Sequence, residues 1–248
     1  VNTEETEVLF QHYLRVQNES GERLEDAILR IPQAEDWTRT VESGEARRFL
    51  TFQQEGLPID KLYISRPAPH SQRGDDGEPI ALVYELENAR DDGLGEFKLE
   101  TGKTRIFAET PTGSTIFAGE DYLPETPVGE EAQLTLGTVK DVLVKRRIME
   151  DRRTNEQYAN NRKRLVKYDR VVRIRYEIEN FKDTEATVRI VEQLPPDAVL
   201  VEYTEEGVSV DRKSGRELEI EIDVPPQETS EDDPMEVVWE YKIPDVLN

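Results

Sequence analysis

Apolar and polar residues alternate along much of the chain, and a period of two predicts β-strands. The alternation is clearest at 171–179, 217–224 and 237–242, where charged residues separate the apolar ones. The positions predicted to face a core are Val172, Ile174, Tyr176, Ile178, Leu218, Ile220, Ile222, Val224, Val237, Trp239 and Tyr241. One buried face and one solvated face are typical of antiparallel sheets.

Turn sequences such as Lys213-Ser-Gly215 and Pro225-Pro226 separate these short strands. Short strands with a turn every ~8–12 residues are typical of β-sandwiches. We therefore predict an all-β fold with two antiparallel β-sandwich domains, of which the C-terminal one is immunoglobulin-like. The polar segment 151–164 has no apolar stripe, so it is predicted to be a loop or a hairpin tip, with a short helix as the alternative.

Two segments of the chain resemble each other. Val16-Gln-Asn18 and Ile178-Glu-Asn180 each end a predicted strand with an asparagine, a residue that tolerates turn conformations, and each precedes a polar loop and a second strand. One such hairpin in each domain places the boundary after Gly137. The predicted domains are therefore residues 1–137 and residues 138–248.

Composition excludes several kinds of chemistry. The 248 residues include no Cys and only two His, so disulfides, thiol nucleophiles and cysteine-ligated metals are excluded. No apolar run is long enough for a transmembrane helix, and no glycine-rich phosphate loop is present. We expect no catalytic residue and no cofactor. A carboxylate-dependent hydrolase is the enzymatic alternative, but nothing selects a catalytic pair among 54 acidic residues.

Charge is unevenly distributed along the chain. The 54 acidic and 32 basic residues give a net charge of −22, which disfavours binding to nucleic acid. Residues 145–175 nevertheless carry 12 basic and four acidic residues. The candidate interaction patch comprises Arg146, Arg147, Arg162, Lys163, Arg164, Arg173 and Arg175. Three interpretations remain open: a site for a polyanion such as a polysaccharide, a surface that docks on acidic residues of the other domain or of a second copy, and a solvated basic face.

Acidic residues gather in the segment 119–131, between glycines and prolines. Glu120, Asp121, Glu125 and Glu130 are candidate ligands for Ca²⁺, which takes six to eight oxygens. Their spacing is not that of an EF-hand loop, and a rigid connection whose acids face water is the alternative. We therefore assign no metal site.

A series of short motifs between residues 80 and 243 resembles the bacterial family called domain of unknown function 4139, which also occurs in mucoidy-inhibitor-A-like proteins. The motifs that carry the resemblance include Tyr84–Asn88, Gly102–Phe107, Phe117–Pro124, Leu134–Gly137, Val144–Arg147, Asn180–Asp183 and Glu192–Pro195. The resemblance implies an all-β, usually exported protein with no assigned catalytic activity, and it supplies no catalytic residue.

Together these observations predict a non-catalytic, extracytoplasmic binding or scaffolding module that acts through protein–protein contacts or self-association. A carbohydrate- or polyanion-binding module that uses residues 145–175 is the alternative.

Overall fold

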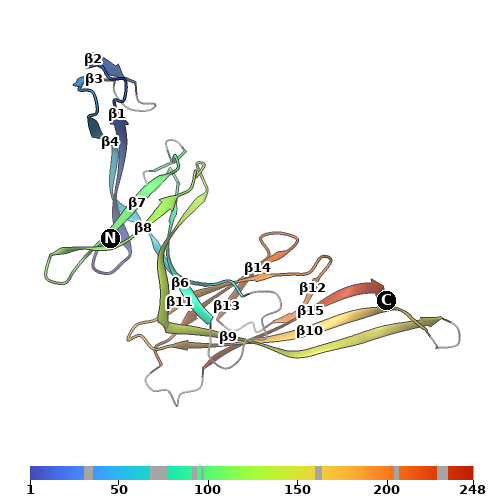
Figure 1. Ribbon diagram of the computed structural model, residues 1–248. Coiled ribbons are helices and arrows are strands. Elements are labelled where there is room, and N and C mark those ends of the chain that lie inside the picture. The colour runs from blue at the N-terminus through green and yellow to red at the C-terminus, as the bar shows by residue number, and fades with distance from the viewer. Residues whose placement is uncertain are drawn as a thin grey trace. The chain divides into compact units, whose positions relative to one another are not determined.

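The computed structural model describes residues 1–30, 36–67, 78–90, 94–95, 98–159, 164–203, 207–227 and 234–247 (Figure 1). All regular elements within these residues are β-strands, which confirms the predicted all-β fold class. No helix in the described part of the chain is long and apolar enough to cross a membrane.

The chain forms two compact units. Unit 1 comprises Val1–Asp60 and Tyr84–Leu134, and unit 2 comprises Lys61–Val83 and Thr135–Asn248. The strands of unit 1 are β1 (Glu7–Gln17), β2 (Leu24–Leu29), β3 (Trp37–Val41), β4 (Ala46–Pro58), β7 (Gly102–Glu109) and β8 (Thr115–Leu123). Unit 2 contains β5 (Asp60–Ser65) from Lys61 on, β10 (Arg164–Asn180), β11 (Ala186–Gln193), β12 (Val199–Tyr203), β13 (Val208–Asp211), β14 (Glu217–Val224) and β15 (Met235–Leu247). Residues of β6 (Glu78–Glu87) and β9 (Glu131–Ala159) belong to both units.

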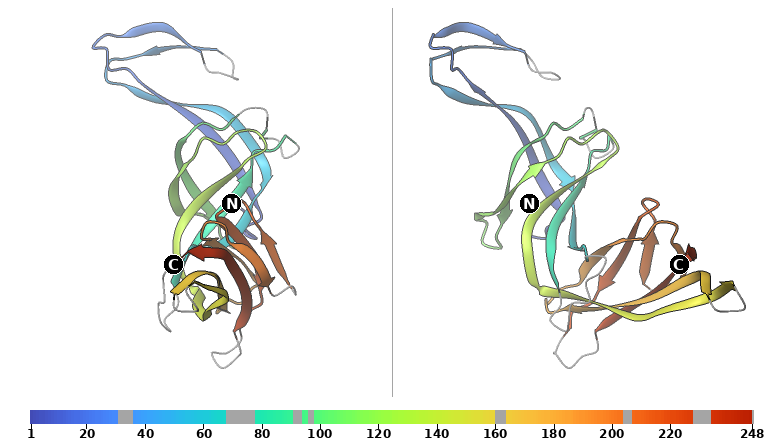
Figure 2. Two further views of the ribbon diagram at one scale, coloured as in Figure 1. Left: turned by 90° about the vertical axis from the view of Figure 1, so that its right-hand side faces the viewer. Right: turned by 45° about the vertical axis from the view of Figure 1, so that its right-hand side comes forward.

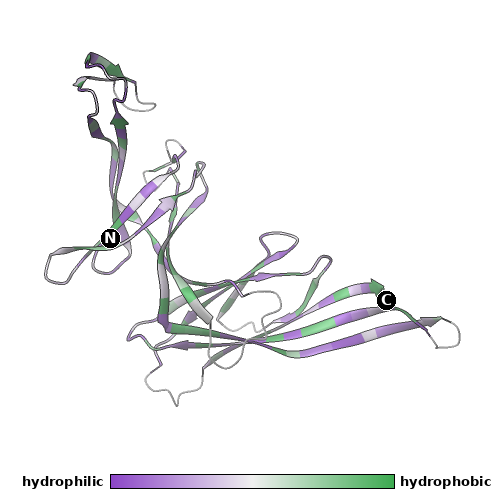
Figure 3. Cartoon of the chain, viewed as in Figure 1, coloured by the Kyte–Doolittle hydropathy of each residue, from purple (hydrophilic) through white to green (hydrophobic). Residues whose placement is uncertain are grey.

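Unit 2 is built on one nine-stranded sheet with the order β12-β15-β10-β9-β6-β5-β11-β14-β13. Strand β10 pairs antiparallel with β9 and β15, and β14 pairs antiparallel with β11 and β13. The two halves of the sheet pack on each other in a sandwich-like arrangement around one core. All eleven positions predicted from the alternation to be buried belong to this core. Figure 3 shows the alternation of polar and apolar residues along β9, β10 and β15.

The two units and the predicted division of the chain assign Lys61–Val83 and the short stretch 135–137 differently. The prediction treats each domain as one continuous stretch, whereas Lys61–Val83 belongs to unit 2. The reason is a non-local pairing, because β5 lies parallel to β11 with Leu62 opposite Thr187 and Ile64 opposite Arg189. A parallel neighbour more than a hundred residues away leaves no periodic signal in the sequence.

Residues 151–159 are neither a loop nor a short helix but paired strand, so of the alternatives for the polar segment 151–164 they agree with the end of a hairpin. Strand β9 continues to Ala159 and β10 begins at Arg164, so the two strands form a long hairpin arm (Figure 2). Polar contacts across the strands stabilise this arm in place of apolar burial. Arg170 donates to both carboxylate oxygens of Asp151, at 2.9 and 2.7 Å. Asp169 accepts hydrogen bonds from Asn155 Nδ2 at 2.7 Å and from the backbone N–H of Asp245 at 3.0 Å.

Three buried asparagines close loops in the same way. Asn18 follows β1, Asn88 follows β6 and Asn180 ends β10. Each side-chain amide donates to two backbone carbonyl oxygens: Asn18 to Glu22 and Val41 at 2.7 and 2.9 Å, Asn88 to Thr126 and Pro127 at 3.0 and 3.1 Å, and Asn180 to Thr184 and Val224 at 2.9 Å each. Each amide thus connects the end of its strand to the backbone of a later segment of the chain.

The backbone around the three asparagines repeats as well. The backbone carbonyl of each asparagine accepts a hydrogen bond from a backbone N–H. The donor lies three residues after one of the carbonyls that the asparagine side chain contacts, namely Val41, Thr126 or Val224. The pairs are Gly44 to Asn18 at 2.7 Å, Gly129 to Asn88 at 2.9 Å and Gln227 to Asn180 at 2.8 Å. Gly44 and Gly129 have φ of 77° and 86°, a backbone conformation that favours glycine. The sequence showed the similarity of Asn18 and Asn180, and the structure adds Asn88 as a third copy.

Candidate interaction site

The predicted interaction patch lies on β9 and β10, but its residues differ in their surroundings. Arg146 is buried, Arg173 and Arg175 are half-buried, and Arg147 and Arg164 are exposed. Arg162 and Lys163 lie outside the described residues. The seven predicted residues therefore do not share one exposed face, and each has to be considered by its own contacts.

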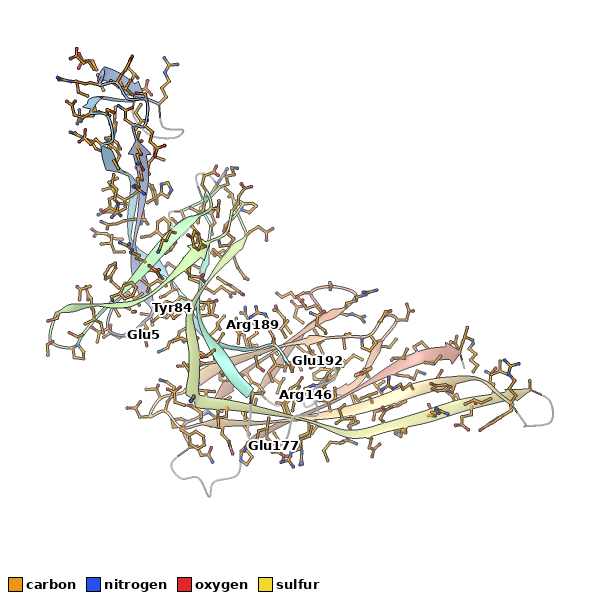
Figure 4. The ribbon with its side chains drawn as sticks, in the orientation of Figure 1. Glu5, Tyr84, Arg146, Glu177, Arg189 and Glu192 are labelled. Carbon is orange, nitrogen blue, oxygen red and sulfur yellow. The ribbon has the colours of Figure 1, made fainter. Side chains whose placement is uncertain are left out.

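Arg146 points into unit 2, where Figure 4 labels it beside Glu192. Its Nε and Nη2 atoms donate to the two carboxylate oxygens of Glu192 at 3.1 and 2.6 Å. The hydroxyl of Tyr176 donates to the same carboxylate. Two further buried donors, Nη1 of Arg146 and Nε1 of Trp239, have no hydrogen-bond acceptor in the part of the chain that the structure describes. The charge of Arg146 is thus neutralised inside the unit.

Burial and pairing shift the pKa values of this buried cluster. Desolvation lowers the pKa of Arg146, but the hydrogen bonds and charge of Glu192 outweigh it, so the net shift is upward. Burial raises the pKa of Tyr176 well above its usual value, and the negative charge of Glu192 adds to the rise. Arg146 is therefore charged and Tyr176 neutral at pH 7. The cluster is a buried ion pair with a neutral hydrogen-bond donor.

Several other basic residues of β9 and β10, but not Arg164 or Arg173, form ion pairs with described acidic residues, most of which lie on neighbouring strands. Arg175 contacts Glu177 at 3.2 Å and Glu236 at 3.0 Å, and Arg147 contacts Glu177 at 3.7 Å. Further pairs are Lys145–Glu179 at 2.9 Å, Arg152–Glu240 at 3.1 Å and Lys167–Asp245 at 2.5 Å. Most of these acids lie outside the window 145–175. The excess positive charge of the window is therefore largely balanced in the folded unit.

The candidate calcium ligands are directed toward lysines or the backbone. Lys103 donates to Glu120 at 2.7 Å, Lys98 donates to Glu125 at 3.1 Å, and Asp121 accepts from the backbone N–H of Tyr122 at 2.8 Å. The described residues contain no group of three or more His, Asp or Glu side chains arranged to hold a metal ion.

Comparisons with protein-family models, with curated proteins and with solved structures find no match for this chain. Its function has to be argued from the surfaces of the two units.

The β7–β8 hairpin of unit 1 exposes an unusual number of large apolar side chains. The exposed fractions are 47% for Phe107, 53% for Ile116, 57% for Phe117 and 69% for Tyr122. Phe107 and Phe117 lie opposite each other across the two strands, with ring centroids 5.7 Å apart at an interplanar angle of 69°. This hairpin is a two-stranded sheet of its own.

The alternation of polar and apolar residues predicts no role for this hairpin, but its charge distribution does set it apart. Residues 110–119 contain no charged side chain in a chain of which 35% is charged. Edge strands of soluble proteins usually carry charges that prevent contact with other chains. In β8 the uncharged stretch is 115–119, before Glu120 and Asp121, and it places an exposed aromatic ring beside Phe107. This local loss of charge therefore indicates a surface that contacts another molecule.

Proposed function

We propose that the chain is a non-catalytic binding or scaffolding module that works outside the cytoplasm through contacts with other protein chains. The observation that carries the proposal is the exposed aromatic pair of the β7–β8 hairpin, Phe107 and Phe117, whose rings contact each other. Ile116 and Tyr122 are exposed on the same hairpin. Contiguous apolar side chains on a soluble unit mark sites of protein–protein interaction. Aromatic residues in particular are enriched in such interfaces.

A structural role for the buried charged residues supports a non-catalytic function. Glu192 is bound by Arg146 and Tyr176, and Asp169 by Asn155 and the backbone of Asp245. The location outside the cytoplasm rests on the resemblance to domain of unknown function 4139. The ion pairs along β9 and β10 make the polyanion-binding alternative less favourable, because a polyanion competes there with carboxylates already in place.

The test compares capture of proteins by matched variants. The full chain is immobilised and exposed to an extract of the source organism's cell envelope at low and high salt. The variant Ile116→Ser/Phe117→Ser removes exposed apolar side chains from β8. The control Ile28→Ser removes an equally exposed side chain, 61% accessible, from the separate β2–β3 sheet.

We expect a discrete protein that is retained by the wild type and by Ile28→Ser, and lost with the double variant. Retention should persist at high salt, since burial of apolar surface is not screened by ions. Retention of an anionic polysaccharide that is lost at high salt would favour the polyanion-binding alternative. Retention unaffected by the double variant would show that β7–β8 is not the contact surface.

A further inference from the structure

Strands β1 and β4 of unit 1 form a two-stranded ribbon with a cationic and aromatic face. In its register Tyr13 lies opposite Leu50 and Arg15 lies opposite Arg48. Residues directly opposite each other in an antiparallel pair, and residues two positions apart, share one face. Tyr13, Arg15, Arg48 and Leu50 therefore gather on one face, and all four are exposed.

The two arginines of this face have no carboxylate partner. Neither Arg15 nor Arg48 forms an ion pair with any described residue, although unit 1 contains 25 acidic and 10 basic residues. Arg48 lies over the ring of Tyr13, with Cζ 4.5 Å from the ring centroid, and Arg15 Nη2 donates to Gln17 at 3.2 Å. Like charges directly opposite in a sheet are destabilising. A pair of carboxylates from another molecule would relieve this repulsion.

The register that brings the arginines together depends on an irregularity in the ribbon. The pairing shifts between His12 and Tyr13, so the residues that follow are displaced relative to a regular ladder. The stretch Tyr13–Gln17 then pairs regularly with Ala46–Leu50. The opposition of Arg15 and Arg48 is thus a property of the local backbone, and it cannot be read from either segment alone.

The remainder of the face can accept an extended chain. Among the described residues β1 and β4 pair only with each other, so the outer backbone edge of each strand is open. Leu50 exposes an apolar side chain two positions from Arg48 on the same face. Gln11 and Gln53 are hydrogen-bonded to each other at 2.9 Å on the same face. Open strand edges with side-chain pockets are the features that recognise peptides by strand addition.

We propose that the face formed by Tyr13, Arg15, Arg48 and Leu50 binds an extended acidic segment of a partner protein. Carboxylates of the segment pair with the two guanidinium groups, and its apolar side chains pack on Tyr13 and Leu50. The apolar residues favour a protein segment over a polysaccharide, which has no aliphatic side chains to bury. The inference rests on the proposed function in so far as the partner is a protein, but it concerns a different surface from β7–β8.

The test measures binding of a short fluorescent peptide of alternating Glu and Leu to the full chain. The variant Arg15→Gln/Arg48→Gln removes both charges. Its control is Arg39→Gln on β3, where the arginine is also exposed and in no ion pair with a described residue. A peptide of alternating Lys and Leu controls for apolar binding, and an oligouronate represents anionic polysaccharides.

We expect the acidic peptide to bind the wild type and Arg39→Gln equally. The double variant should raise its Kd by about tenfold or more, because two charge-assisted contacts are lost. The double variant should keep the thermal stability of the wild type, since it relieves repulsion between exposed groups. Salt should weaken the wild-type complex, and the Lys–Leu peptide should not bind.

Three results would overturn the inference: no binding of the acidic peptide, equal binding by the double variant, or tighter binding of the oligouronate that the same variant abolishes. Any of these would leave the proposed function intact if the β8 variant still abolishes protein capture. Conversely, peptide binding that depends on Arg15 and Arg48 would stand even if no protein is captured through β7–β8.

Discussion

The guanidinium of Arg146 and the carboxylate of Glu192 face each other inside unit 2, with 4% and 3% of their side chains exposed. Arg146 lies on β9 and Glu192 on β11, so the pair connects strands of the two halves of the nine-stranded sheet. Tyr176 on β10 adds a third hydrogen bond to the carboxylate. Residues of three strands thus meet at one buried carboxylate, that of Glu192.

Removal of one member of this ion pair should destabilise unit 2 strongly. Arg146→Met leaves Glu192 buried without its cation, which costs about 3–5 kcal/mol in systems of this kind. The triple variant Arg146→Met/Glu192→Leu/Tyr176→Phe removes every polar member and should recover most of the loss. Unfolding in urea, followed by the fluorescence of Trp239 in a Trp37→Phe background, measures both effects. A triple variant as unstable as Arg146→Met would show that the cluster also specifies the packing of the core.

Loss of a loop-closing asparagine should also lower the free energy of unfolding. Asn180→Ala removes the buried side-chain donor to the carbonyl groups of Thr184 and Val224, which costs about 1–3 kcal/mol. Asn180→Asp should cost more, because a carboxylate then faces two carbonyl oxygens. Gln157→Ala, at an exposed position of β9, should change stability by less than about 0.5 kcal/mol. Urea unfolding of unit 2 compares the three variants, and equal stability of Asn180→Ala and wild type would contradict the prediction.

Acid should weaken the hairpin arm of β9 and β10. The backbone N–H of Asp245 and the amide of Asn155 hold the pKa of Asp169 below its ordinary value, and Lys242 adds to the shift. A carboxyl group whose pKa is lower in the folded than in the unfolded state stabilises the fold above its unfolded pKa, and this contribution disappears as pH falls through the folded pKa. The stabilisation is therefore present at pH 7 and is lost below about pH 4.

The variant Asp169→Asn isolates this contribution. It should lower the melting temperature at pH 7 and make the melting temperature less dependent on pH below about 4. Hydrogen exchange of amides in the arm, measured at pH 7, should be faster in the variant than in the wild type. If the two proteins lose stability in parallel on acidification, another carboxylate such as Asp151, whose pKa Arg170 lowers, controls the response.

The sequence predicted the core of unit 2 well, because the information was local. In β14 and over most of β10 a single face is buried, so residues such as Ile174 and Ile220 alternate with charged neighbours and their burial follows from a period of two. The end of β9, residues 151–159, shows no such alternation of apolar and charged residues. Their pairing is stabilised by contacts such as Arg170–Asp151 that connect side chains 19 residues apart.

The candidate site depended on information that a sequence window does not contain. The charges of Arg152 and Arg175 are balanced by Glu240 and Glu236, which β15 brings to their side from more than sixty residues away. The opposition of Arg15 and Arg48 depends on the shift in register after His12. Neither relationship changes the composition or the periodicity of the segments involved, so both became visible only with the strand pairing.

Charge reversal at Arg175 separates a binding role from a structural one. If Arg175 belonged to an exposed interaction patch, Arg175→Glu would weaken binding to a partner and leave the stability of unit 2 unchanged. The structure instead places Arg175 between Glu177 and Glu236, with 24% of its side chain exposed. The free energy of unfolding of Arg175→Glu should therefore fall by about 1 kcal/mol, because two ion pairs are lost and the new carboxylate is repelled by both acids. Arg164→Glu, at an exposed position in no ion pair with a described residue, should stay within about 0.5 kcal/mol of the wild type.

A charge swap completes this comparison. Adding Glu236→Arg to Arg175→Glu restores one of the two ion pairs with its polarity reversed, so the double variant should regain about half of the lost stability. Chemical denaturation of the wild type, the single variants Arg175→Glu and Glu236→Arg, and the double variant gives the coupling free energy between positions 175 and 236. A coupling near zero would mean that the pair contributes nothing measurable in solution. Arg175 would then be available for an external partner, and the patch predicted from the sequence would again be a candidate interaction site.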